Sequence, residues 1–204
     1  YEKYKAHRKP PPDELIAQAP TARELVSAFN IPILEIEGFE ADDIVGTLAR
    51  KAGREGFDIT IVTGDHDELQ LVDDNVKVMI TVKGVSETAL YDETAVEEKY
   101  GLKPEQLPDY KALKGDASDN IPGVPGIGPK TAQRLIEEYG TVEDVIINAE
   151  KLKNVKLRES FRLHAGQARL SRQLAGIRKD IDIDFDFQNA VVKERFQCFK
   201  GGDF

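Results

Sequence analysis

The stretch 114–132 constrains the fold more than any other part of this chain. It contains two aspartates, Asp116 and Asp119, followed by closely spaced glycine and proline residues. This composition predicts a tight hairpin, because glycine adopts left-handed backbone angles and proline cannot continue a helix. A new helix is expected to start at Pro129, since proline is favoured at the first helical position. The stretch therefore predicts a hairpin between helices with two carboxylates at its entrance.

The hairpin itself is a candidate phosphate site. Free backbone amides at Ile127 and Gly128, together with the Lys130 side chain, would form a concave set of donors at a helix start. The alternative is a tight turn that binds nothing. The basic residue in the first turn of the helix favours the phosphate site.

Composition limits the class of protein. The 204 residues suffice for one large domain or two modest ones. A single cysteine, Cys198, excludes a disulfide framework and a multi-cysteine zinc site. No apolar run is long enough for a membrane span, so no membrane partner is expected. The only methionine is Met79, so Tyr1 is not an initiator and the chain is expected to be a fragment.

Upstream of the hairpin, strand and helix signals alternate. Residues 31–36, 58–62 and 76–82 are β-branched, apolar runs, which predicts three buried strands. Residues 40–56 show helical spacing of apolar positions. This order predicts an α/β part with a parallel sheet, whose ligands bind at the carboxyl ends of the strands.

From residue 92 onward the pattern is helical, with two helices expected over residues 157–177. Residues 181–187 alternate apolar and acidic residues, which indicates an edge strand or an extended tail. We therefore predict an α/β core, a helical domain and a C-terminal extension, over residues 1–91, 92–187 and 188–204.

Seven acidic residues form three groups in the sequence: Glu40, Asp42 and Asp43; Asp65 and Asp67; Asp116 and Asp119. Any one group has a plainer interpretation, as acids that decorate a helix start or a turn. Carboxylates brought together would repel one another unless divalent ions neutralise them, and oxygen ligands suit Mg²⁺ or Mn²⁺. Two such ions, roughly 3.5–4 Å apart, can promote phosphodiester cleavage. Lys5 and Arg8 either belong to a solvated basic helix or steer phosphate groups to this site.

Four stretches match one family in order and spacing across nearly the whole chain. They are Tyr-Lys-Ala-His-Arg (4–8), Glu-Ala-Asp-Asp (40–43), Thr-Gly-Asp-His-Asp (63–67) and the stretch 115–132, which begins Gly-Asp-Ala-Ser-Asp-Asn. On these motifs the chain resembles the 5′ nuclease domain of bacterial DNA polymerase I, in the flap endonuclease superfamily. The resemblance implies a PIN-like α/β core followed by an all-helical helix–hairpin–helix domain. It also implies 5′–3′ exonuclease and 5′-flap endonuclease action on flapped or nicked duplex DNA, with two divalent ions.

The resemblance also implies roles for single residues. The first ion would be held mainly by Glu40, Asp42 and Asp43. The second would be held mainly by Asp65, Asp67 and Asp119, with Asp116 in the inner or outer shell. Lys5 and Arg8 match basic residues of a helical arch near the scissile phosphate. The hairpin would grip the duplex backbone and hold K⁺ on its carbonyls, through Gly123, Val124, Gly126, Ile127, Gly128, Lys130 and Thr131.

The chain also departs from the family. An earlier segment with the first strand and two further aspartates is missing, so we expect a truncated core with an incomplete first ion site and poor cleavage by this piece alone. His66 stands where the polymerases usually have lysine. Residues 192–204 loosely resemble the segment leading toward the next domain. We therefore expect the chain to be covalently continuous with a polymerase. The protein is expected in the bacterial cytoplasm, associated with the nucleoid.

The residues are also compatible with other functions. They are a non-catalytic DNA-binding module in which only the hairpin matters, a stand-alone flap endonuclease-like exonuclease, and a ribonuclease of the wider PIN class. The last would lack the long helical region. A reading frame upstream of Tyr1 that encodes a strand ending in Asp-Gly would favour the nuclease.

Overall fold

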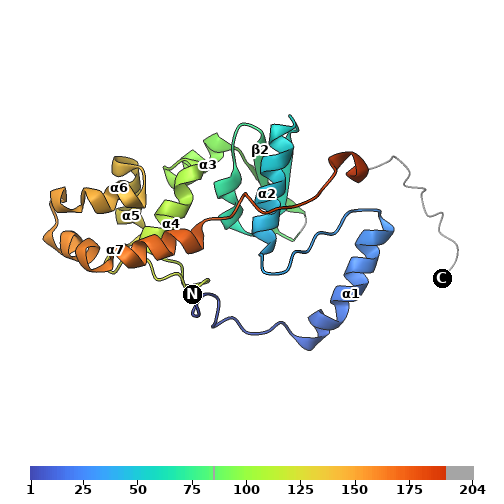
Figure 1. Ribbon diagram of the computed structural model, residues 1–204, viewed down its shortest axis with the longest axis horizontal. Coiled ribbons are helices and arrows are strands. Elements are labelled where there is room, and N and C mark those ends of the chain that lie inside the picture. The colour runs from blue at the N-terminus through green and yellow to red at the C-terminus, as the bar shows by residue number, and fades with distance from the viewer. Residues whose placement is uncertain (85, 192–204) are drawn as a thin grey trace.

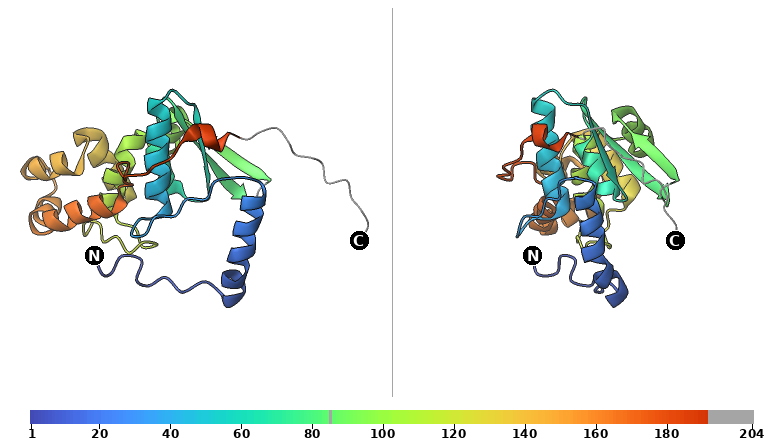
Figure 2. Two further views of the ribbon diagram at one scale, coloured as in Figure 1. Left: turned by 45° about the vertical axis from the view of Figure 1, so that its right-hand side comes forward. Right: turned by 90° about the vertical axis from the view of Figure 1, so that its right-hand side faces the viewer.

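The computed structural model describes residues 1–84 and 86–191 (Figure 1). Its first part is an α/β core in which one helix lies against one face of a three-stranded sheet (Figure 2). The elements of this core are α2 (Ala41–Arg54), β1 (Ile59–Thr63), the 3₁₀ helix η1 (His66–Leu71), β2 (Val76–Lys83) and β3 (Glu87–Tyr91). The covered face of the sheet is apolar and buried, as Ile61, Val78 and Ile80 show.

The sheet is only partly parallel. β1 and β2 are parallel, with Ile61 opposite Val78, as predicted. The third strand, β3, was not predicted from the sequence; it pairs with β2 in the antiparallel direction and places Leu90 opposite Met79. An antiparallel neighbour needs only a short turn, whereas a parallel one needs a crossover connection.

The strand predicted over residues 31–36 is wrong. These residues follow an irregular path, and no strand among the described residues pairs with them. Leu34 and Ile36 instead pack against Ile44 of α2 and against Ile181 and Ile183. Their apolar character therefore serves packing on a helix rather than a place in the sheet.

The second part is helical. Its elements are α3 (Glu93–Tyr100), η2 (Pro104–Gln106), α4 (Leu107–Lys114), α5 (Pro129–Tyr139), α6 (Val142–Ile147), η3 (Ala149–Lys151), α7 (Val155–Ala175) and η4 (Phe187–Ala190). The start at Pro129 is confirmed. The two helices predicted over residues 157–177 are joined end to end in α7, with non-helical backbone angles at His164.

Buried Asp109 of α4 ties the helical part together. It accepts hydrogen bonds from Arg172 Nε of α7 at 2.8 Å and from the Val142 amide of α6 at 2.9 Å. One hydrophobic core runs through both parts of the chain, from Ile61 of β1 to Phe161 of α7. The sheet and the helices therefore hold a fixed relation, which matters for a site built from both.

Two segments lie outside the main hydrophobic core. Helix α1 (Asp13–Ala28) stands away from it and buries none of its residues (Figures 1 and 2). The segment after α7 crosses α2 as an extended tail, since Ile181 and Ile183 are buried on Ile44 without a strand partner among the described residues. The expectations for residues 192–204, including Cys198, lie outside the described residues. No described helix is both long and apolar enough to cross a membrane.

Candidate metal centre and hairpin

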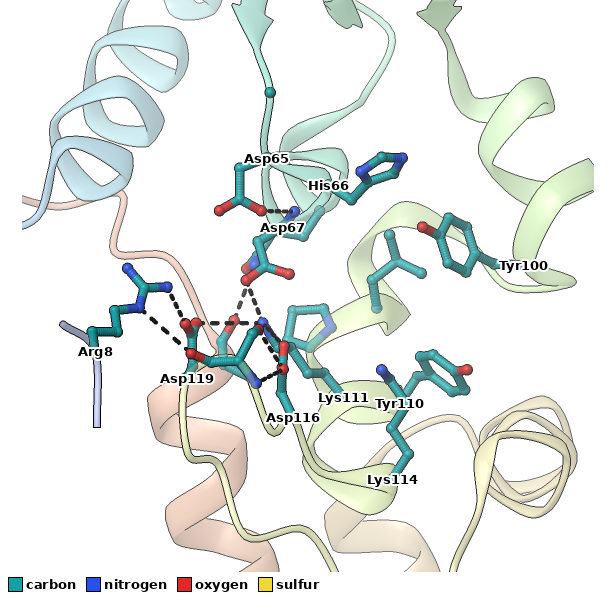
Figure 3. A pocket seen from close by; sticks show the side chains of 16 residues that line it. Arg8, Asp65, His66, Asp67, Tyr100, Tyr110, Lys111, Lys114, Asp116 and Asp119 are labelled. Carbon is teal, nitrogen blue, oxygen red and sulfur yellow. Dashed lines mark hydrogen bonds and ion pairs between the residues drawn. The ribbon is translucent and has the colours of Figure 1, made fainter. Parts of the chain in front are cut away.

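Three carboxylates meet where the α/β core joins the helical part (Figure 3). Asp67 lies in the first turn of η1, just after the carboxyl end of β1, and Asp116 and Asp119 lie in the loop after α4. One oxygen from each carboxylate lies within 4.8 Å of the other two. The adjacent cavity has a volume of about 540 Å³ and is also lined by Arg8 and His66.

Lys111 of α4 lies among these three carboxylates. Its Nζ contacts Asp67 and is 2.7 Å from Asp116 Oδ2 and 3.6 Å from Asp119 Oδ2. Its side chain is only 9% exposed, and a lysine this buried is almost always paired. Lys111 was not among the site residues predicted from the sequence. The signal for its burial in the sequence was its position immediately before two apolar residues, Ala112 and Leu113. Both are fully buried in the structure.

Burial and ion pairing act in opposite directions on these groups. Burial lowers the pKa of Lys111, but its hydrogen bonds to Asp116 and Asp67 outweigh this effect and raise the pKa. Burial raises the pKa of Asp67 against the opposing effect of Lys111. For Asp116, the effect of burial is overcome by Lys111 and Ser118, which lower the pKa to about 2. Ser118 donates to Asp116 Oδ1 from its amide at 2.7 Å and from its hydroxyl at 2.6 Å.

The N-terminal segment reaches both ends of the acidic region. Arg8 Nη2 is 2.5 Å from Asp119 Oδ1, and Figure 3 shows the guanidinium pointing at that carboxylate. Lys5 Nζ is 2.5 Å from Glu40 Oε2, and the Lys5 amide donates to the Asp119 carbonyl at 3.0 Å. The two basic residues singled out in the sequence are therefore brought to the acids.

The remaining predicted acids lie beside this group without joining it. Glu40 precedes α2, whose first turn holds Asp42 and Asp43, and Asp43 Oδ1 accepts a hydrogen bond from the Arg178 amide at 2.9 Å. Asp65 Oδ1 accepts from the Asp67 amide at 2.9 Å. A second cavity of about 220 Å³ is lined by Glu40, Asp42, Asp43, Asp67 and Asp119.

The close group overlaps in part with the set that the resemblance implies for the second ion. It contains Asp67 and Asp119, together with Asp116, which was expected in the inner or outer shell, and it does not contain Asp65. Glu40, Asp42 and Asp43 form no comparably close group within residues 1–84 and 86–191. Asp67 and Asp119 line both cavities and therefore connect the two sets of acids.

Glu68 is a further acid of this region, and it was not predicted from the sequence. It is 5% exposed, and its Oε2 has no hydrogen-bond partner among the described residues. Burial, with Asp42 and Asp65 nearby, raises its pKa to about 7. The pattern of the sequence gives no signal for this burial, because acids are usually exposed.

The hairpin is anchored on α7. The Gly123 amide donates to Ser171 Oγ at 3.2 Å, and its carbonyl accepts from Gln167 Nε2 at 2.7 Å. Gly123 has φ +64°, and a Cβ there would lie 2.4 Å from the Gly115 amide nitrogen. Only glycine fits this close approach of two backbone segments.

One expectation for the hairpin is wrong. The Ile127 amide is not free, because it donates to the Val124 carbonyl at 3.1 Å. The side chains of Val124 and Ile127 are buried in the core, so the turn closes on itself instead of opening toward a ligand at this point. The predicted contact residues at the surface are Gly126, Gly128 and Lys130, with Thr131 half-buried.

The donor set fits a divalent cation. Oxygen ligands suit Mg²⁺ and Mn²⁺, and the Lys111 ammonium already lies where a cation would be held by all three carboxylates. The fold and site together define a class: α/β proteins with a carboxylate cluster at the carboxyl end of a strand, followed by a helical unit.

Comparisons with known proteins agree with this class. Residues 1–101 match the family model of the 5′–3′ exonuclease N-terminal resolvase-like domain, and residues 102–197 match that of the 5′–3′ exonuclease C-terminal SAM fold. The chain belongs to the 5′–3′ exonuclease family. It is 48% identical to DNA polymerase I of Bacillus caldotenax over 95% of this chain and 22% of that protein. The chain thus spans about a fifth of that relative's length.

Solved structures of similar fold include two of bacteriophage T5 enzymes. The T5 flap endonuclease in a complex with DNA and metal ions has a TM-score of 0.71 and 25% identity, over 85% of this chain and 66% of that one. The T5 5′-exonuclease with bound zinc has a TM-score of 0.67 and 25% identity, over 84% of this chain and 63% of that one.

Proposed function

We propose that this chain forms part of a metal-dependent 5′ nuclease that hydrolyses DNA at 5′ flaps and nicks. The observation that carries the proposal is that Asp67, Asp116 and Asp119 all lie around one position, which the Lys111 ammonium occupies and which suits a metal ion. Membership of the 5′–3′ exonuclease family and the similarity to a flap endonuclease seen with DNA and metal ions support it.

In this proposal, Asp67, Asp116 and Asp119 hold one ion, Mg²⁺ or Mn²⁺, and Glu40, Asp42, Asp43 and Asp65 serve another. A bound ion would activate water and stabilise the leaving oxygen. Arg8 and Lys5 orient the scissile phosphate, since both cations lie at the border of the acidic region. Lys5 is paired with Glu40 and Arg8 with Asp119, which keeps the basic side chains in place for the substrate.

The hairpin contributes the grip on duplex DNA. Its exposed residues Gly126, Gly128 and Lys130, with Thr131, contact the phosphate backbone, and K⁺ on the hairpin carbonyls would strengthen the contact. The loop between α4 and the hairpin fixes the distance to the acids, because Asp116 and Ile121 exchange two backbone hydrogen bonds of 2.9 and 2.8 Å. Where the duplex is held then determines which phosphate reaches the carboxylates.

The whole protein would join this nuclease to a DNA polymerase and act at the bacterial nucleoid. The support is the length of the polymerase relative, of which the chain matches 22%.

The test uses the full-length protein and a labelled 5′-flap substrate. Cleavage should require Mg²⁺ or Mn²⁺, stop with EDTA, and be lost after Asp65→Ala combined with Asp67→Ala. Asp74→Ala, an exposed aspartate beside β2, is the matched control. Full activity of the double variant would contradict the assignment of Asp65 and Asp67 as ion ligands. If the unaltered protein binds DNA but does not cleave it, the result would favour a non-catalytic DNA-binding module.

A further inference from the structure

The position of the Lys111 ammonium has a consequence for ion binding. An ammonium has three N–H donors, and three carboxylates from two separate segments surround this one. Asp67 comes from η1, whereas Asp116 and Asp119 come from the loop after α4. Lys111 therefore cross-links the α/β core and the helical part through their acids.

The space between the three carboxylates has room for one cation. The three carboxylate oxygens lie within 4.8 Å of one another, and the ammonium is already among them. A divalent ion placed on the same oxygens would lie within contact range of the ammonium, and two cations at such a distance repel strongly in a buried site. The neighbouring cavity of about 540 Å³, which Lys111 lines, gives its flexible side chain room to leave.

We propose that Lys111 is a resident counter-ion of the Asp67, Asp116 and Asp119 group, and that a divalent ion binds there by displacing its ammonium. The inference rests on the proposed function, because it takes these acids as ion ligands. Lys111 is then a positioning residue: it keeps the carboxylates together before the ion arrives and weakens the ion's apparent affinity.

The first experiment compares Lys111→Met with the unaltered full chain by calorimetric titration with Mn²⁺ and by thermal unfolding. Met keeps the length and apolar stem of lysine without its charge. We expect Mn²⁺ to bind about tenfold more tightly, the scale on which a neighbouring charge changes a carboxylate's affinity for a proton. Without Mn²⁺ the variant should unfold at a lower temperature, and saturating Mn²⁺ should restore much of the loss.

Lys114→Met is the matched control. Lys114 lies on the same helix and lines the same cavity, but its Nζ lies over the Tyr110 ring, 5.4 Å from the centroid. Its replacement should leave both Mn²⁺ affinity and the stabilisation by Mn²⁺ unchanged. Equal or weaker Mn²⁺ binding by Lys111→Met would overturn the displacement.

A second measurement needs no variant, in case Lys111→Met fails to fold. Acetic anhydride modifies exposed lysine amines, and mass spectrometry follows each site. Lys111 should be protected in EDTA and become reactive when Mn²⁺ is added, with Lys114 as the internal reference. Protection of Lys111 that persists at saturating Mn²⁺ would overturn the proposal.

The outcomes separate this inference from the proposed function. In one outcome, Asp116→Asn abolishes Mn²⁺ binding but Lys111 stays protected from acetylation when Mn²⁺ is added. This result would support the ion site and reject the counter-ion role of Lys111. Absence of Mn²⁺ binding at this group in both the unaltered chain and Lys111→Met would reject both.

Discussion

Two sets of carboxylates lie side by side in this molecule and differ in what neutralises them. Asp67, Asp116 and Asp119 face the Lys111 ammonium, and Asp119 also faces Arg8. Next to them, Asp42 and Asp65 lie close enough to Glu68 to raise its pKa, and these three take part in no ion pair within the described part of the chain, whereas the nearby Glu40 is paired with Lys5. The first set is compensated by cations of the protein itself, and the second is not.

The pKa values of Asp116 and Glu68 reflect this difference, although burial raises the pKa of Asp67 in the first set even against the effect of Lys111. Lys111 and Ser118 lower the pKa of Asp116 to about 2 despite its burial, whereas burial raises the pKa of Glu68 to about 7. Burial, with Asp65 nearby, also raises the pKa of Asp42. Buried carboxylates without a cation favour the neutral form. The compensated set is therefore arranged before any ion binds, while the uncompensated set should respond more strongly to pH and to added ions.

The largest loss of activity is expected when a charge is removed from the compensated set at Asp119. Asp119→Asn keeps the shape but removes a charge that faces both Lys111 and Arg8. We expect kcat/KM on a 5′-flap substrate to fall by at least about a hundredfold, because even residues that only support metal ligands contribute 10–100-fold. Steady-state cleavage assays in Mg²⁺ measure this. Asp74→Asn is the control, and a fall of less than threefold in Asp119→Asn would remove this residue from the site.

The second prediction addresses the uncompensated set through Glu68. In the folded state the pKa of Glu68 is about 7, above its ordinary value of 4.5. Between pH 4.5 and pH 7, Glu68 therefore binds a proton more often in the folded state than in the unfolded state. Stability should therefore fall as pH rises from about 4.5 to 7. Glu68→Gln should remove this slope and raise stability at pH 8 by about 1–3 kcal/mol, because the amide carries no charge and a pKa change of one unit corresponds to about 1.4 kcal/mol.

Urea unfolding in EDTA at pH 5 and pH 8 tests the Glu68 prediction. Glu97→Gln, an exposed glutamate of α3, is the control for loss of a carboxylate. An unchanged pH slope in Glu68→Gln would place the source of the slope in another group.

A smaller effect is expected for acid unfolding of the compensated set. The folded pKa of Asp116, about 2, lies below its ordinary value of 3.8. Its contribution to stability is therefore fully present above about pH 4 and is lost as pH falls toward 2. Asp116→Asn should flatten the wild-type loss of stability over this window, measured by circular dichroism in EDTA. An equally steep loss in the variant would mean that Lys111 does not stabilise the ionised form.

The smallest effect is expected outside both sets, at the hairpin. Lys130 is exposed at the start of α5. Lys130→Ala should weaken duplex binding for every sequence and reduce the salt slope, −dlogK/dlog[salt], by about 1. Fluorescence anisotropy between low and moderate salt measures both. Lys156→Ala, at the exposed start of α7, is the comparison; an equal loss there would indicate a diffuse charge effect rather than a hairpin contact.

Local structure was largely predictable from local residues. Pro129 begins a helix as expected, and β1 and β2 lie where β-branched runs predict them. Asp65 and Asp67 follow the carboxyl end of β1, as expected from the strand predicted just before them. The predicted strand over residues 31–36 failed because apolar residues can pack on a helix as well as in a sheet, and only a partner strand decides between them.

The residues alone sufficed to predict the hairpin and the start of α5. Both depend on short-range constraints, such as a glycine that can adopt φ +64° or a proline at the first helical position. The order of the acids and the resemblance to the family also follow from the residues alone. Which carboxylates meet, and which cation meets them, depends on the fold. Lys111 and Asp67 are 44 residues apart, and Arg8 and Asp119 are 111 apart. Charge compensation of buried carboxylates depends on such distances in space, because a pKa responds to burial and to neighbouring charges within a few ångströms.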